Sequence, residues 1–297
     1  MKSFLHLFYK IRGKFLENSA KNKLSKLKNS EYRLPYQIPY VSQYASAERA
    51  EEFVKKASKK RANIIVFPEN FLSHPINENK EFIDKEGKAR SELQKIAKTH
   101  KIDIVCGTIL EREKDGKNYN ISYYIDSSGE IKAKYKKIHL WYPEKPEISP
   151  GHKIKVFDTK YGKIGLIVCW DLIFPEIFRR MANKGAQIVI CPSHWCYGDA
   201  GKGIKYDKNS EAKLVNSLCT ERAFENEIIL AYCNTAGKLK NKNFTDVSIG
   251  RSQITEPFKG AIKKFHHNKE GMLMKEVDTK ILKDAESVYK IKKDMGS

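Results

Sequence analysis

The sequence predicts an α/β protein with one large domain. Stretches of apolar, β-branched residues alternate with stretches whose apolar residues recur at helical spacing, and no linker separates one such unit from the next. Of the 297 residues, 40% are hydrophobic, which is enough to bury a sizeable core. We therefore expect one domain over residues 31–285, an N-terminal extension over residues 1–30 and a C-terminal tail over residues 286–297.

The first thirty residues differ from the rest of the chain. Their apolar side chains recur at the spacing of one helical face: Phe4, Leu7, Phe8, Ile11 and Phe15. Lysines flank this face, which predicts a basic amphipathic helix over residues 3–16. Three interpretations stay open: the apolar face packs on the enzyme or across a dimer, it binds reversibly to an anionic membrane surface, or the segment is disordered. No long apolar run with a cleavage site is present here, so we expect no secretory signal.

From residue 31 the predicted strands and helices alternate. An irregular or edge strand over residues 32–41 is interrupted by Pro35 and Pro39. A helix with Ser46 at its N-cap follows, and then an apolar strand of the kind that is covered on both faces. The remaining predicted elements of this half are the helices over residues 46–61 and 89–100, the strands over 63–69 and 102–110, and a hairpin over 119–140 with a Ser-Ser-Gly turn.

The second half repeats the alternation after a proline-rich loop. A second hairpin is expected over residues 156–170, with its turn at Lys160–Gly162. A helix closed by Gly185 leads to the next strand. The remaining predicted elements are helices over 175–186 and 211–227, a loop over 198–209, and strands over 187–193, 228–237, 248–257 and 271–278.

Charge and cysteine content narrow the function classes. The net charge is +20, but the lysines are spread along the whole chain without a helix-turn-helix, RRM-like or finger pattern, so we expect no specific nucleic-acid partner. The six cysteines lie mostly in apolar runs and form no CxxC pair. This favours reduced thiols in a cytoplasmic protein over a disulfide framework or a zinc site. No apolar stretch approaches the about 20 residues of a membrane span.

Three reactive side chains lie at or near the ends of predicted strands. Glu69 ends one strand, Lys137 lies near the end of the first hairpin, and Cys169 ends the apolar run of the second. In open α/β folds ligands gather beyond the carboxyl ends of strands, where residues far apart in sequence can meet. A carboxylate, an ammonium and a thiol in one dry pocket suit acyl transfer, because they can supply a base, an oxyanion partner and a nucleophile.

Structural interpretations of the same residues stay open at this point. Cys169 could be a packed small hydrophobe, Glu69 a carboxylate that caps a helix, and Lys137 one lysine among many. A Cys–His pair with His139 or His194 is a further alternative. The glycine-rich stretch over residues 198–203 lacks the GxxxxGK[ST] spacing, so we expect no phosphate site there.

Three sequence blocks resemble, in order and separation, the signature blocks of the nitrilase superfamily, the carbon–nitrogen hydrolases: FPEN, YKKIHL and CWDLIFPE. The likeness covers about residues 31–280. It implies the four-layer αββα sandwich of that family, in which helices cover the outer faces of two packed sheets. It also implies a homo-oligomer, a dimer or higher, that pairs through the region after the nucleophile, residues 171–180.

The resemblance assigns catalytic roles residue by residue. It implies Glu69 as the general base, Lys137 as the lysine that stabilises the oxyanion, and Cys169 as the nucleophile. The family pattern places its lysine two residues before the histidine of a His-Leu pair, here His139, which selects Lys137 over Lys136. The two lysines also point to opposite faces of a strand, so only one can enter the pocket.

The resemblance also implies a fourth catalytic residue. A glutamate stands seven residues before the glycine of a Pro-Gly loop, which selects Glu144 rather than Glu147, and we expect it to orient Lys137 and the substrate. Trp170, His194 and Trp195 are the expected substrate-binding residues, with simple packing as the alternative for His194.

These residues predict an amidase-like hydrolase that cleaves an amide or ureido carbon–nitrogen bond through a Cys169 thioester and releases ammonia. The Cys block is similar to that of carbamoylputrescine-type amidases, which favours such substrates over nitriles. We expect no metal and no organic cofactor. The alternative is an N-acyltransferase in which an amine intercepts the thioester, with the N-terminal helix docking on a membrane or a carrier protein. We expect a cytoplasmic protein, peripheral at the membrane if that helix binds lipid.

Overall fold

The structure is a computed structural model that describes residues 32–34, 47–73, 83–240 and 245–294. Every statement below concerns these residues. The predicted helix over residues 3–16 and the predicted N-cap at Ser46 lie outside them.

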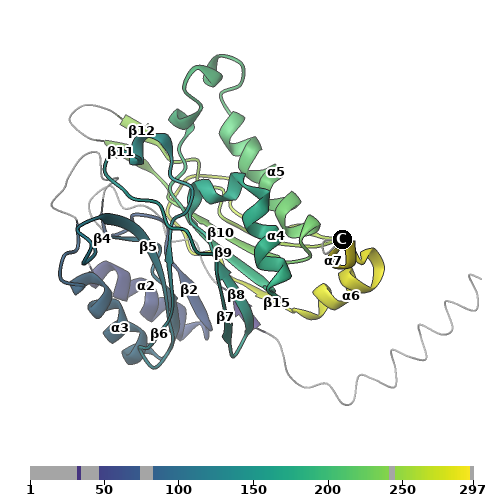
Figure 1. Ribbon diagram of the computed structural model, residues 1–297, viewed down its shortest axis with the longest axis horizontal. Coiled ribbons are helices and arrows are strands. Elements are labelled where there is room, and N and C mark those ends of the chain that lie inside the picture. The colour runs from purple at the N-terminus through teal and green to yellow at the C-terminus, as the bar shows by residue number, and fades with distance from the viewer. Residues whose placement is uncertain (1–31, 35–46, 74–82, 241–244, 295–297) are drawn as a thin grey trace, which may run out of the picture. The chain divides into compact units, whose positions relative to one another are not determined.

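Apart from one short strand, the first half of the described chain supplies two helices and the five strands of one sheet (Figure 1). They are α2 (Ala47–Lys59), β2 (Ile64–Val66), α3 (Lys88–His100), β3 (Asp103–Val105), β4 (Ile109–Arg112), β5 (Asn118–Ile125) and β6 (Ile131–Lys136). The short strand β1 (Tyr32–Leu34) pairs instead with β15 (Lys275–Val277).

The second half supplies the other large sheet and its helices. They are β7 (Lys155–Thr159), β8 (Gly162–Leu166), α4 (Pro175–Asn183), β9 (Ile188–Ser193), α5 (Ser210–Glu225), β10 (Ile229–Asn234), β13 (Gln253–Glu256) and β14 (Gly260–Lys264). Smaller elements are the 3₁₀ helices η2 (Tyr142–Glu144), η3 (Cys169–Ile173) and η4 (Tyr197–Lys205), the pair β11 (Lys238–Lys240) and β12 (Thr245–Val247), and the helices α6 (Lys280–Tyr289) and α7 (Ile291–Asp294).

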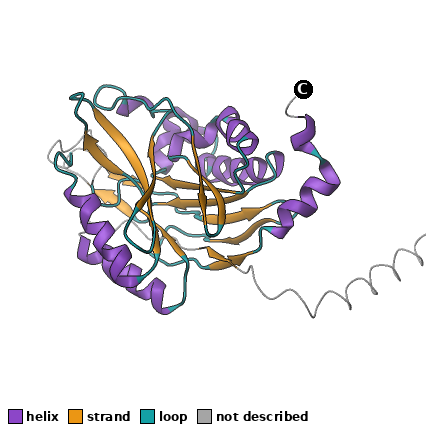
Figure 2. Cartoon of the chain, turned by 60° about the horizontal axis from the view of Figure 1, so that its bottom comes forward, coloured by secondary structure: helices purple, strands orange, loops and turns teal. Residues whose placement is uncertain are grey.

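Two mixed sheets form the centre of the fold. One has six strands in the order β14-β13-β10-β9-β8-β7, with β8, β9 and β10 parallel. The other has five strands: β2 runs parallel to β3, and β5 pairs antiparallel with β3, β4 and β6. Figure 2 shows the strands enclosed between groups of helices.

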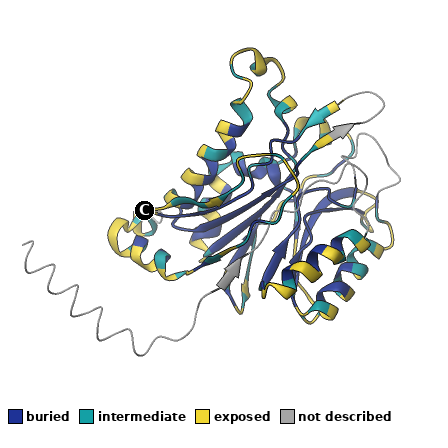
Figure 3. Ribbon diagram, turned by 180° about the vertical axis from the view of Figure 1, so that it is seen from behind, coloured by how far each residue is buried: buried dark blue, intermediate teal, exposed yellow. Residues whose placement is uncertain are grey.

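The helices pack on the outer faces of these sheets because their apolar residues recur on one side. In α2 the buried residues are Ala50, Phe53, Val54 and Ala57, which share one helical face. They contact the side chains of the five-stranded sheet that point outward, Ile65 among them, whereas Ile64 and Val66 belong to the core between the two sheets. Figure 3 shows this division of each outer helix into a buried and an exposed side.

This layering confirms the predicted four-layer αββα sandwich. The predicted hairpins are present as β5–β6 and β7–β8, the latter in register from Lys155 opposite Leu166 to Thr159 opposite Gly162. Gly185 closes α4 with a positive φ of 81°. Several details differ: residues 102–110 form two strands instead of one, and the expected loop over residues 198–209 contains η4. The pair β11–β12, the strand β14 and the helix α6 were not predicted.

Two further observations concern the state of the cysteines and the presence of membrane-spanning helices. All six cysteines are buried free thiols. Within the described residues, no helix combines the length and the apolar character that crossing a membrane would require.

Candidate active site

Glu69 lies three residues beyond β2, in a loop pressed against the connection between β3 and β4. A Cβ atom at Gly107 would lie 2.0 Å from the carbonyl oxygen of Pro68, so only glycine fits where the two loops cross. The Asn70 N–H donates to Thr108 Oγ1 at 3.0 Å. These contacts hold the loop in place and leave Glu69 2% exposed.

Lys137 directly follows β6, and its ammonium group lies between two carboxylates. Nζ is 2.9 Å from Glu69 Oε1 and 2.6 Å from Glu144 Oε2, and the side chain is 1% exposed. Burial lowers the pKa of Lys137, but the carboxylates of Glu144 and Glu69 outweigh it and hold that pKa well above the ordinary lysine value. Lys137 is therefore a buried, permanently charged cation.

Glu144 ends the 3₁₀ helix η2 and receives two hydrogen bonds at one oxygen. Besides Lys137, the backbone N–H of Trp141 donates to Oε2 at 2.7 Å. Burial raises the pKa of Glu144 above the ordinary glutamate value, although the Lys137 ammonium opposes that shift. The side chain is 16% exposed, so Glu144 is the more accessible of the two carboxylates.

Asn120 on β5 joins the two carboxylates, a role that the sequence analysis missed. Its Nδ2 donates to Glu69 Oε1 at 2.8 Å and to Glu144 Oε1 at 3.1 Å. All eight residues of β5 are buried. An amide inside such a strand must find hydrogen-bond partners, and that requirement was the signal available in the sequence.

Cys169 begins the 3₁₀ helix η3, three residues beyond β8. Its backbone has a positive φ of 47°, which an L-residue rarely adopts, so a sharp turn presents this side chain. The thiol is 3.6 Å from the carbonyl oxygen of His194, and the N–H of the same residue donates to Glu69 Oε2 at 3.0 Å. One peptide segment after β9 thus contacts both the thiol and the carboxylate.

The resting thiol is protonated. Burial and the negative charge of Glu69 raise the pKa of Cys169 well above the ordinary cysteine value, and the Lys137 ammonium opposes them. Attack by this sulfur therefore needs a base that removes the proton. Glu69 is a carboxylate whose charge acts on this thiol.

Asp171 ties the nucleophile turn to the lysine segment, a second role missed from sequence. It is fully buried and accepts hydrogen bonds from the Val168 N–H at 3.0 Å and from the Tyr135 hydroxyl at 2.7 Å. The His139 N–H and ring Nδ1 both lie 2.8 Å from its other oxygen. Tyr135 and His139 flank Lys137 in sequence, so Asp171 fixes the lysine relative to the cysteine.

The three predicted substrate-binding residues occupy different environments. Trp195 is 1% exposed, and its indole N–H donates to Glu211 Oε2 at 2.6 Å, so it packs behind the site. Trp170 is partly exposed, and its ring centroid is 5.5 Å from that of Trp195. His194 meets Glu69 and Cys169 through its main chain.

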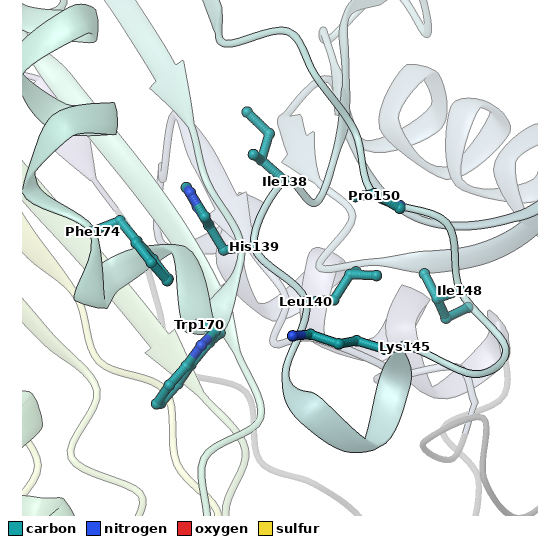
Figure 4. Close-up of a pocket in the computed structure, with 8 residues that line it drawn as sticks. All are labelled: Ile138, His139, Leu140, Lys145, Ile148, Pro150, Trp170 and Phe174. Carbon is teal, nitrogen blue, oxygen red and sulfur yellow. The ribbon is translucent and has the colours of Figure 1, made fainter.

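A pocket of about 450 Å³ opens beside Trp170. Residues that follow three of the predicted catalytic side chains line it: His139 after Lys137, Lys145 after Glu144, and Trp170 after Cys169. Figure 4 shows the Lys145 side chain extending toward Trp170, with the stacked rings of His139 and Phe174 on the same side. The wall of this pocket therefore continues into the segments that hold the reactive groups.

The arrangement contains the groups that acyl transfer needs. A thiol, a carboxylate that can take its proton and a fixed ammonium that can stabilise an oxyanion lie together in a site shielded from water. Within the described residues, no group of three or more His, Cys, Asp or Glu side chains could hold a metal ion.

Known proteins share this sequence pattern and fold. A family model described as carbon-nitrogen hydrolase matches residues 35–286. The 2-oxoglutaramate amidase of Bacillus subtilis is 30% identical over 235 residues, which cover 78% of this chain and 83% of that protein.

Solved structures of other proteins have the same fold as this chain. Nit3 of Saccharomyces cerevisiae, a member of branch 10 of the nitrilase superfamily, aligns with a TM-score of 0.74 at 26% identity and covers 88% of this chain and 95% of its own. A mutant of the amidase of Nesterenkonia sp. AN1 aligns with a TM-score of 0.69 at 25% identity over 85% of this chain and 96% of its own. That structure shows the Michael addition of acrylamide at the active site cysteine of the amidase. The chain described here belongs to the carbon–nitrogen hydrolase family.

Proposed function

We propose that this enzyme is a cysteine amidase, which hydrolyses a small amide or ureido substrate through a thioester on Cys169 and releases ammonia. One observation carries the proposal: the buried Lys137 ammonium is held between Glu69 and Glu144, and Glu69 shares the His194 peptide segment with the Cys169 thiol. A thiol, a base and an oxyanion partner arranged in this way suit attack on a carbonyl carbon.

The first half-reaction forms the thioester. Glu69 takes the proton of the Cys169 thiol, and the sulfur forms a bond to the carbonyl carbon of the substrate. The carbonyl electron pair moves onto oxygen, where the Lys137 ammonium and the Trp170 backbone N–H stabilise the negative charge. Glu69 returns the proton to the substrate nitrogen, the carbon–nitrogen bond breaks, and ammonia leaves.

The second half-reaction consumes one water molecule. Glu69 takes a proton from that water, whose oxygen attacks the thioester carbon. The carbon–sulfur bond breaks, the proton returns to sulfur, and the acid product leaves. Acid and base roles thus alternate on a single carboxylate.

Glu144 and Asn120 set the geometry for both steps. Glu144 and Glu69 both bind the ammonium, and Asn120 donates to both carboxylates. A fixed ammonium does not have to reorient as charge develops on the oxyanion, which is the basis of electrostatic preorganisation. Substitution of either residue should therefore reduce the turnover rate strongly and change the free energy of unfolding little.

The similarity to relatives that are named amidases supports an amide substrate. The direct test is ammonia release from a panel of small amides, ureido compounds and nitriles. We expect release from amide or ureido compounds with the wild type and with Cys219→Ala, a control at a buried thiol on α5, and none with Cys169→Ala. Release from nitriles alone would contradict the proposed substrate class. Product that forms only with an added amine would favour the N-acyltransferase.

A further inference from the structure

A peptide group just after β9 connects the nucleophile to the neighbouring strand β10. The carbonyl group of His194 and the N–H of Trp195 belong to this one planar unit. Its oxygen accepts from the Cys169 thiol at 3.6 Å, and its N–H donates to Asn234 Oδ1 at 2.8 Å. Because C=O and N–H point in opposite directions in a planar trans peptide, the side chain that holds the N–H also sets the direction of the oxygen.

The preceding peptide group is held in the same manner. The Ser193 carbonyl oxygen accepts from the Thr235 N–H at 3.2 Å. The His194 N–H, on the other side of that peptide group, donates to Glu69 Oε2 at 3.0 Å. The end of β10, at Asn234 and Thr235, therefore holds both peptide groups through which His194 contacts the thiol and the carboxylate.

The Asn234 side chain is itself locked in place. It is 0% exposed, and besides the bond that Oδ1 accepts, Nδ2 donates to the carbonyl oxygens of Trp195 and Gly250 at 3.0 Å each. Its backbone N–H donates to Ser252 Oγ at 2.7 Å. The amide thus binds both main-chain polar groups of Trp195, as a neighbouring strand would. It cannot turn without breaking these bonds, so it also fixes the His194 carbonyl group.

We propose that Asn234 is a positioning residue that fixes the His194–Trp195 peptide group. The Cys169 thiol is thereby kept within reach of Glu69, which takes its proton. The inference rests on the proposed function, in which Cys169 is the nucleophile and Glu69 the base. The parallel pairing of β9 with β10 ends one residue before His194, so it does not hold the residue that contacts these two groups. The Asn234 amide takes the place of that pairing.

Asn234→Ala removes the hydrogen bonds of this amide and leaves the His194–Trp195 peptide group free to turn. The thermal unfolding midpoint and the turnover rate should both fall. A displacement of about 1 Å between reacting groups lowers the rate about a hundredfold, so we expect a loss of kcat of that order. KM should stay within about twofold of the wild type, because the change affects the reacting groups and not the contacts that bind the substrate.

Asn226→Ala is the matched control for the loss of a buried amide. Asn226 is also 0% exposed, and its Nδ2 donates to the Arg222 carbonyl oxygen at 3.0 Å. It precedes β10, whereas Asn234 ends this strand of six residues, so the two amides are separated by about 20 Å of strand. Asn226→Ala should lower the unfolding midpoint as well, but its kcat should equal that of the wild type.

Asn234→Asp is the conservative variant, because it keeps the volume of the side chain and an oxygen that can accept from the Trp195 N–H. Burial raises the pKa of such a carboxyl group, so at about pH 5 it keeps a proton that it can donate to one of the two carbonyl oxygens. At about pH 8 it is ionised, and its charge repels both oxygens. Its kcat, as a fraction of the wild-type kcat at the same pH, should therefore be higher at the acidic pH. Asn234→Ala should show the same fraction at both pH values.

The test measures kcat and KM for an amide that the wild type hydrolyses, at a temperature at which circular dichroism shows each variant to be folded. A kcat in folded Asn234→Ala equal to that of the wild type would overturn the inference, as would an equal loss of kcat in Asn226→Ala. Failure of both Asn234 variants to fold would make the amide structural and would overturn it too. In these cases the wild type still releases ammonia, and the proposed function stands. If the wild type hydrolyses no amide or ureido compound, the proposed function itself fails, and this inference fails with it.

Discussion

At the residue scale, Lys137 controls the charge balance of the site. Its ammonium lies within 2.9 Å of Glu69 and 2.6 Å of Glu144, and water is excluded from it. Lys137→Met would leave two carboxylates facing each other in the interior. Breaking a buried pair in this way costs about 3–5 kcal/mol of unfolding free energy. We expect turnover to disappear as well, because the oxyanion loses its cation.

The unfolding free energy that Lys137→Met loses should be smaller at acidic pH than at alkaline pH. Without the lysine the pKa of the Glu144 carboxyl, already raised by burial, rises further in the folded state, so this group gains a proton at mildly acidic pH and the repulsion ends. Denaturant unfolding of Lys137→Met should therefore show a smaller loss near pH 5 than near pH 8. Lys136→Met is the matched control, because Lys136 is 30% exposed and pairs with Glu113 at the surface. An equal loss in both variants would contradict the account.

A second residue-scale prediction concerns Asp199 in η4. Burial raises its pKa to about 7, and the negative charges of Asp246, Glu211 and Glu69 add to the shift, while the Cys196 N–H opposes it. The raised pKa means that the folded state favours the protonated form. The stability that this group contributes is therefore present below about pH 4 and is lost as the pH rises to about 7.

Asp199→Asn removes the decrease in stability that accompanies ionisation of Asp199. The asparagine keeps an oxygen that can accept a hydrogen bond from the Cys196 N–H. Its gain in unfolding free energy over the wild type should be absent at low pH and reach up to about 4 kcal/mol at pH 8. Denaturant unfolding at two pH values measures it. Asp207→Asn, on the segment between η4 and α5, should give no such gain. A gain of the same size at both pH values would show that the charge of Asp199 is not its cause.

At the scale of elements, Asp171 joins the turn of η3 to the end of β6. Its carboxylate accepts from Val168, Tyr135 and His139, so both segments depend on one buried side chain. Asp171→Asn places an amide donor against groups that themselves donate. We expect a loss of about 1–3 kcal/mol in unfolding free energy and at least a tenfold loss of kcat with little change in KM, because the variant displaces Lys137 from Cys169. A kcat equal to that of the wild type would refute this link.

Much of the element order could be predicted from sequence because local patterns decide it. The face Ala50–Phe53–Val54–Ala57 specifies a helix without reference to the rest of the chain, and Gly185 marks the end of another. The signature blocks were sufficient to predict the family and its fold, which the comparisons confirm. The roles of Glu69, Lys137, Cys169 and Glu144 stay predictions.

The features that could not be predicted depend on contacts between residues far apart in the sequence, which no local sequence pattern indicates. Residues 102–110 look like one strand, but Gly107 adopts a positive φ of 59° where the chain passes Pro68, and the strand divides there. Asn120 and Asp171 are ordinary polar residues in sequence. Their importance follows from which carboxylates and backbone groups the fold brings to them.

At the scale of the whole described domain, the site is assembled from both sheets. Glu69 and Lys137 follow strands of the five-stranded sheet, whereas Cys169 and His194 follow strands of the six-stranded sheet. The reactive groups therefore meet only when the two sheets are packed in the right register. The expected homo-oligomer stays a prediction, and Leu172, Ile177 and Phe178 of the expected pairing segment lie in the core of this chain.

The N-terminal extension belongs to the same scale, although residues 1–31 lie outside the described structure. In a flotation assay, we expect the full chain to float with vesicles of anionic lipid. A chain that starts at Tyr32 should not float with them. Insertion of the apolar face and attraction of about 1 kcal/mol per lysine near the surface would drive the binding. Amide turnover should be equal in the two forms. Flotation that is absent, or unchanged by the truncation, would rule out the membrane interpretation.

The central claim is that Cys169 carries the acyl group during turnover. Mass spectrometry of the enzyme quenched during turnover of an amide that it hydrolyses measures this directly, peptide by peptide. The account predicts an acyl adduct on the peptide that contains Cys169, lost on further incubation and absent from Cys169→Ala. An adduct on the peptide of Cys191 or Cys219, or hydrolysis that persists in Cys169→Ala, would contradict it.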